Sequence, residues 1–71
     1  MRAKFYIKAG NEPVTFSICF QTNNAIVNTG TVTIDCSLNE IKIEPGRIKL
    51  GTSFINNVPE HQAAALKKFL G

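Results

Sequence analysis

The sequence predicts an α+β domain: an antiparallel, meander-like sheet of five to six short strands with one C-terminal helix packed on it. Two patterns predict this fold. Apolar and polar residues alternate in short segments between residues 2 and 51, which is typical of half-buried strands. From about residue 58 to residue 70, the apolar residues instead recur with the period of a helix. With 71 residues, the chain has room for a single domain, residues 1–71.

The strands follow from the alternation and from the turn-forming residues between them. They are expected at residues 2–8, 13–21, 25–28, 31–36, 40–44 and 47–51. The first two form a hairpin, because residues 9–13 have the composition of a turn. The second strand directs Val14, Phe16, Ile18 and Phe20 to one face, which we expect to be the apolar one. A small SH3-like barrel with an appended C-terminal helix is the alternative arrangement of the same elements.

The clearest hairpin lies around Pro45-Gly46, because apolar and charged residues alternate strictly on both sides of it. A turn there pairs Glu44 with Arg47, Ile43 with Ile48, Lys42 with Lys49 and Ile41 with Leu50. The two lysines are then directly opposite each other, which slightly destabilises a sheet and suggests a function. Pro-Gly favours a type II turn, whose twist suits a two-residue hairpin poorly. A longer or bulged loop with slipped pairs is therefore a second expectation.

The C-terminal helix is expected at about residues 58–70. Pro59 fits the first helical position, and Lys67 and Lys68 suit the negative end of the helix dipole. The apolar stripe that we expect to face the sheet consists of Ala63, Leu66, Phe69 and Leu70. Asn57 or Val58 is the expected N-cap, and Asn57 followed three residues later by Glu60 matches a capping box.

The two cysteines are expected to be reduced. Strand parity places Cys36 on the apolar face, with Val32 and Ile34, and Cys19 on the opposite face of the sheet, so the thiols cannot approach for a disulfide. The chain has no apolar run of membrane-spanning length and no signal-peptide pattern behind its first residues. We therefore expect an intracellular, cytoplasmic protein that does not bind a membrane.

The residue types do not favour an enzyme. His61 is the single histidine and lies on the expected outer side of the helix. Asp35 and Cys36 are adjacent on a strand, so they point to opposite faces and cannot build a nucleophilic site with His61. The cysteines and the histidine lack the spacing of metal ligands, and the glycines do not form a phosphate-binding loop. We expect no catalytic residues, no metal, no cofactor and no small-molecule substrate.

We expect instead a small accessory protein that binds a larger macromolecule. The first hypothesis is docking on a protein partner, or self-association, through Tyr6, Cys19 and Ile26, which parity places together on the polar face. The alternative is nucleic-acid binding, because the net charge is +3 and the pI is about 9.1. The outward basic residues assigned to this alternative are Lys4, Lys8, Lys42, Arg47 and Lys49. Tyr6 is the one aromatic residue expected among them, whereas sheets that bind single strands usually present several.

Overall fold

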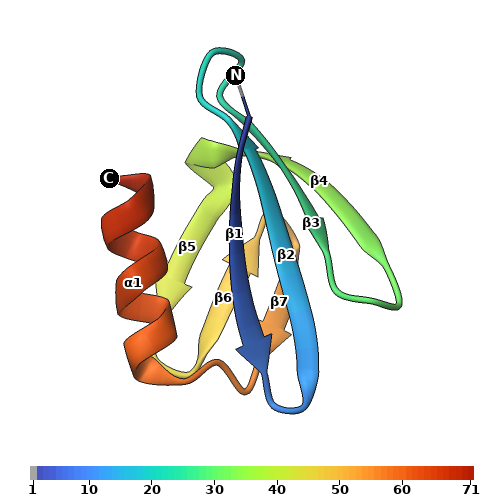
Figure 1. Cartoon of the computed structure of the whole chain (residues 1–71), viewed down its shortest axis with the longest axis vertical. Helices are drawn as coiled ribbons and strands as arrows, with labels where there is room; N and C mark the ends of the chain where they lie inside the picture. The colour runs from blue at the N-terminus through green and yellow to red at the C-terminus, as the bar shows by residue number, and fades with distance from the viewer. Residues whose placement is uncertain (1) are drawn as a thin grey trace.

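The structure, a computed structural model, describes residues 2–71. Its elements in chain order are β1 (Arg2–Ala9), β2 (Glu12–Cys19), β3 (Asn24–Asn28), β4 (Thr33–Ser37), the 3-10 helix η1 (Leu38–Glu40), β5 (Ile41–Glu44), β6 (Arg47–Leu50), β7 (Ser53–Asn56) and the α-helix α1 (Glu60–Leu70). The strands form two antiparallel sheets, β1-β2-β3-β4 and β5-β6-β7, in which each strand pairs with its neighbours in the sequence (Figure 1). The predicted α+β class is confirmed, whereas the sheets do not close into a barrel, so the barrel alternative is wrong.

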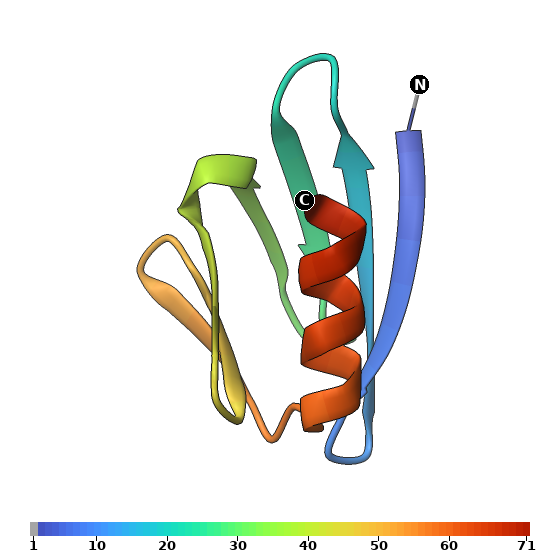
Figure 2. The ribbon, with the colours of Figure 1, turned by 90° about the vertical axis from the view of Figure 1, so that its left-hand side faces the viewer.

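The inner faces of the two sheets enclose the core, and α1 covers one side of the space between them (Figures 1 and 2). The helix packs against the edge strands β1 and β5, one from each sheet. The buried core residues are Ile7, Val14, Phe16, Ile18, Ala25, Val27, Cys36, Ile48, Leu50, Ile55, Val58, Ala63 and Leu66. No helix among residues 2–71 is long and apolar enough to cross a membrane.

The β5–β6 hairpin has the register that the sequence predicts, with all four expected pairs from Glu44↔Arg47 to Ile41↔Leu50. The turn keeps two residues, so the expectation of a longer loop with slipped pairs is wrong. Gly46 has φ +76°, the left-handed conformation that a type II turn needs at its second central residue. Beside the turn, Arg47 Nε donates to Glu44 Oε1 at 2.6 Å, and this ion pair supports the register.

A seventh strand, β7, was not predicted. It pairs with β6, so that Phe54 lies opposite Lys49 and Ile55 lies opposite Ile48. Ile55 is directed into the core and is 6% exposed, whereas Phe54 is directed outward. The sequence signal is weak, because the strand has only four residues and its two apolar residues are adjacent rather than alternating.

Two residues that were expected on the apolar face of their strands lie in turns instead. Strand β2 ends at Cys19, and the following Phe20 is 50% exposed. Strand β4 begins at Thr33, and the preceding Val32 is 55% exposed. Both side chains therefore belong to the surface of the protein.

The predicted capping box of α1 is wrong. The helix begins at Glu60, and the N-cap is Pro59, whose side chain makes no capping hydrogen bond. Asn57 instead has φ +60°, and its carbonyl oxygen accepts a hydrogen bond from the amide of Gly10 at 2.8 Å. This bond joins the β1–β2 turn to the segment that follows β7. Within residues 2–71, a capping box is found at η1, where Ser37 and Glu40 make the reciprocal bonds.

Candidate functional site

The residues predicted to form a docking surface share one face without forming a continuous patch. Tyr6, Cys19 and Ile26 all lie on the outer face of the β1–β4 sheet, as parity predicts. Tyr6 is 67% exposed, but Thr15 and Ser17 of the intervening strand β2 separate it from Ile26. Ile26 is half-buried and Cys19 is only 9% exposed, so this face offers one isolated aromatic ring.

The two thiols are free and lie on opposite faces of the sheet, as predicted. Hydrogen bonds from the Thr22 side chain and the Thr22 amide favour the thiolate and lower the pKa of Cys19. Burial raises the pKa of Cys36, and the nearby charges of Glu40 and Asp35 raise it further. The environments of the two thiols therefore shift their pKa values in opposite directions.

We expect iodoacetamide to modify Cys19 before Cys36 in the folded protein at about pH 8, because the thiolate is the reacting species. Peptide mass spectrometry after short exposures measures both rates. Thr22→Val removes the hydroxyl donor, so it should slow the modification of Cys19 and leave Cys36 unchanged. Earlier modification of Cys36 would contradict the assigned environments.

The five basic residues of the nucleic-acid hypothesis are divided between two surfaces. Lys4 and Lys8 follow the edge strand β1 on the outer face of the first sheet. Lys42, Arg47 and Lys49 gather on the outer face of the β5–β7 sheet. Because the sheets pack through their inner faces, the two outer faces point in opposite directions.

The outer face of the β5–β7 sheet also carries an aromatic residue that the sequence pattern does not predict there. Phe54 is 43% exposed, with the Arg47 guanidinium carbon 4.5 Å and the Lys49 ammonium 5.9 Å from its ring centroid. Lys42, Arg47, Lys49 and Phe54 are called the basic-aromatic face below. Cation–π contacts of this kind stabilise the sheet surface even when no ligand is bound. They also place positive charge beside an aromatic ring.

Three phenylalanines gather where α1 ends. The ring centroid of Phe69 is 5.0 Å from that of Phe5 in β1 and 6.2 Å from that of Phe20 in the β2–β3 turn. Phe5 is half-buried, whereas Phe69 is 36% and Phe20 50% exposed. Phe5, Phe20 and Phe69 are called the aromatic patch below. The sequence does not predict this patch, because the alternation and the helical stripe place both Phe20 and Phe69 in the apolar interior.

A groove of about 480 Å³ lies between α1 and β5 and ends near the same end of the helix. Its apolar lining is supplied by Leu38, Ile41, Ile43 and Leu70, all of which are half-buried. Lys42, Glu44 and Lys67 add charged groups to the lining. Apolar surface is therefore exposed on both sides of α1: in this groove beside β5 and in the aromatic patch beside β1.

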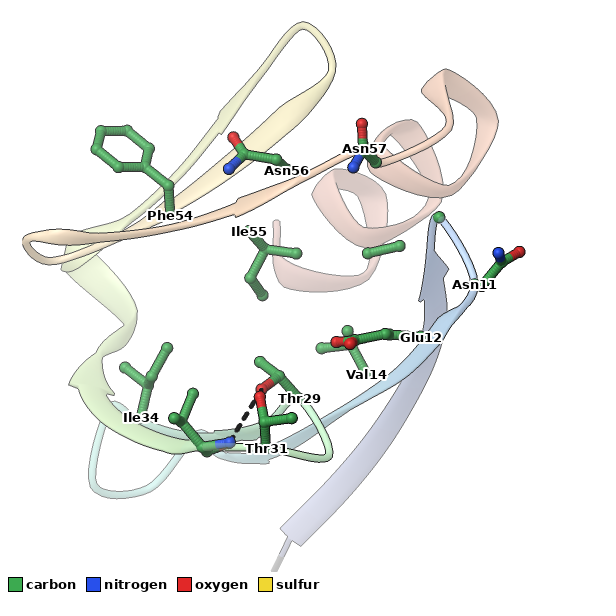
Figure 3. A pocket seen from close by; sticks show the side chains of 13 residues that line it. Asn11, Glu12, Val14, Thr29, Thr31, Ile34, Phe54, Ile55, Asn56 and Asn57 are labelled. Carbon is green, nitrogen blue, oxygen red and sulfur yellow. Dashed lines mark hydrogen bonds between the residues drawn. The ribbon is translucent and has the colours of Figure 1, made fainter.

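A second cavity, of about 470 Å³, opens between the β1–β2 turn, the β3–β4 turn and β7 (Figure 3). Its apolar lining consists of Ala9, Val14, Val32, Ile34, Phe54 and Ile55. Its polar lining consists of Asn11, Glu12, Thr29, Thr31, Asn56 and Asn57. The Thr29 hydroxyl accepts a hydrogen bond from the amide of Val32 at 3.2 Å (Figure 3). With one carboxylate and no cation, this lining suits a neutral polar group better than an anion.

The groups with catalytic or metal-binding chemistry lie apart from one another. His61 is exposed on α1, Cys36 is buried in the core, and Asp35 is exposed on the outer face of β4. In the described part of the chain, no group of three or more histidine, cysteine, aspartate or glutamate side chains gathers around a common point.

No protein-family model, no curated protein and no solved structure matches this chain.

Proposed function

We propose that this protein is a non-enzymatic binding protein that docks on a protein partner through the aromatic patch. The observation that carries the proposal is the exposure of Phe20 and Phe69, which are in ring contact with each other at one end of the molecule. Exposed apolar residues that cluster are typical of interaction sites, and buried aromatic anchors contribute much of the free energy of binding at protein interfaces. The free thiols support an intracellular location as part of this proposal.

The charges beside the aromatic patch favour a different protein over a second copy of this chain. Lys67 and Lys68 precede Phe69 in the last turn of α1 and are both exposed. An interface between two copies around a two-fold axis would bring these lysines toward their own equivalents. A partner that presents apolar side chains surrounded by carboxylates would instead complement both the rings and the lysines.

The proposal predicts that Phe20→Ser abolishes partner binding while the protein stays folded. Phe20 is half exposed and lies in a turn, so its loss should change the free energy of unfolding by about 1 kcal/mol or less. Loss of an anchoring ring should weaken binding of the purified partner by tenfold or more. Immobilised wild-type and Phe20→Ser proteins are compared by mass spectrometry of the captured proteins and then by calorimetric titration.

Tyr6→Ser is the matched control, because it removes another exposed aromatic ring from a different surface. A protein retained by the wild type and Tyr6→Ser but lost from Phe20→Ser supports the proposal. The proposal would be contradicted if the wild type and both variants retained the same proteins equally, or if a protein were lost from Tyr6→Ser alone. It would also be contradicted if the wild type captured no protein specifically. Sedimentation over a range of protein concentrations tests self-association, and a dimer that Phe20→Ser dissociates would assign the patch to a second copy.

A further inference from the structure

The basic-aromatic face is arranged as a continuous row across three strands. Lys42 of β5 lies opposite Lys49 of β6, and Lys49 lies opposite Phe54 of β7. In the adjoining row, Arg47 lies between Glu44 and Asn56. Directly opposite residues on one face have Cβ atoms about 5 Å apart. The two ammonium groups and the ring can therefore contact the same ligand.

The two lysines of this row carry charge that the protein does not neutralise. Glu44 pairs with Arg47, and this is the one ion pair among residues 2–71. Lys42 and Lys49 instead repel each other, because like charges directly opposite in a sheet are destabilising. An anion placed between them converts this repulsion into two attractions. The pair is thus an unfavourable element of the free protein and a favourable element of an anion complex.

The ring of Phe54 and the guanidinium of Arg47 add a stacking surface beside the lysines. The guanidinium carbon lies 4.5 Å from the ring centroid, and β7 is an edge strand with no further strand beyond it. Nucleic-acid bases stack on aromatic rings and on guanidinium planes alike. The same face therefore offers contacts for phosphates and for a base.

We infer that the basic-aromatic face binds single-stranded nucleic acid. Phe54 and Arg47 stack with a base, while Lys42 and Lys49 contact the flanking phosphates. Three strands about 4.8 Å apart present a surface about 10 Å wide, which suits a short stretch of about two nucleotides. In a duplex the bases already stack on one another, so the ring would have no base to contact. The few cations would also give a duplex only a small share of the phosphate contacts that duplex binders make.

The cations of β1 have a different role. Lys4 and Lys8 lie on an edge strand, where lysines discourage pairing with the edge of another sheet. Their strand neighbours on the same face, Ser17 and Pro13, are uncharged, and neither lysine has a cationic residue opposite it. This surface belongs to the first sheet, so it cannot contribute to the same short stretch of nucleotides. It provides the control for the test of the inference.

The test measures how binding depends on salt. The probe is a labelled deoxythymidine oligomer of about a dozen nucleotides, titrated by fluorescence anisotropy at several salt concentrations. Each phosphate neutralised on a single strand contributes about −0.7 to the slope of log K against log salt, so the two lysines give a slope of about −1.4. Lys42→Gln with Lys49→Gln should bring the slope close to zero. Lys4→Gln with Lys8→Gln removes the same net charge and should leave the slope at about −1.4.

Phe54→Leu tests the stacking contact without changing the charge. We expect affinity for the oligomer to fall by about tenfold, with the salt slope unchanged. Thermal unfolding of each variant shows whether the sheet is intact. No binding by the wild type at low salt, equal effects of the two lysine pairs, or tighter binding of a blunt duplex of the same length would each overturn the inference. None of these experiments changes Phe20, which carries the proposed protein docking. A negative result for nucleic-acid binding would therefore leave the docking proposal untouched, and the reverse also holds.

Discussion

Replacing Phe16 with alanine is expected to lower the free energy of unfolding by about 3–5 kcal/mol. Phe16 is 0% exposed and lies on the inner face of β2, opposite Phe5 of β1 and Val27 of β3. The variant loses the transfer free energy of the ring and leaves a cavity between the two sheets. A chain of 71 residues has a total stability of about 4–11 kcal/mol, so the change removes a large share of it.

Urea unfolding followed by circular dichroism measures this effect as a shift of the midpoint. Tyr6→Ala is the matched control, because it removes an aromatic ring from the same sheet but from its exposed outer face. We expect the control to change stability by about 0.5 kcal/mol or less. A Phe16→Ala midpoint equal to that of the control would show that the sheets do not pack through this ring.

Leu66→Ala is expected to lower the free energy of unfolding by about 2–5 kcal/mol, which would show that α1 is anchored in the core. Leu66 is 0% exposed, and Ala63, one turn earlier, is 6% exposed and lets the helix approach the sheets. Phe69→Ala should have a smaller effect, about 2 kcal/mol at most, because Phe69 is 36% exposed and packs on other rings of the aromatic patch.

The comparison of Leu66→Ala with Phe69→Ala separates the structural side of the helix from its binding side. Both variants are measured by urea unfolding, and Ala65→Ser on the exposed side serves as the reference. A larger effect from Phe69 than from Leu66 would mean that the aromatic patch is chiefly a part of the core. The proposed docking through that patch would then lose its main support.

The sequence predicts best those parts of the fold in which apolar and polar residues alternate over many positions and the turn residues are clear. The register of the β5–β6 hairpin follows from residues 41–50 alone, since a one-residue slip would direct every isoleucine into solvent. The opposite placement of Cys19 and Cys36 follows from parity in the same way. In both cases the decisive information is local.

Strand β7 and the division into two sheets are set by tertiary contacts. Ser53–Asn56 has no alternation of its own, and it forms a strand because Ile55 fills a place in the core beside β6. Because β7 was not predicted, Phe54 was not recognised as an outward residue. Tyr6 was therefore taken as the single aromatic residue among the outward cations. The basic-aromatic face could be recognised only once β7 was placed.

The aromatic patch could not be predicted because it depends on where strands and helices end. Phe20 continues the apolar alternation of β2 by one residue, yet the chain turns before it, and boundaries are the least certain part of such predictions. Phe69 belongs to the apolar stripe of α1, but it packs on the rings of Phe5 and Phe20 rather than inside the core and stays 36% exposed. In the sequence both residues fit the apolar pattern of a buried face. Their exposure is seen only in the three-dimensional arrangement.

The pairing of each strand with its neighbours in the chain has a consequence for how the protein folds. Every sheet contact joins segments separated by a short turn, so each hairpin can form without closing a long loop. Folding rates rise as the sequence separation of contacts falls, and a β-rich protein built in this way should fold faster than one with distant strand pairing. The docking of α1 on β1 joins the two most distant segments, so we expect it to complete the native structure after the hairpins are in place.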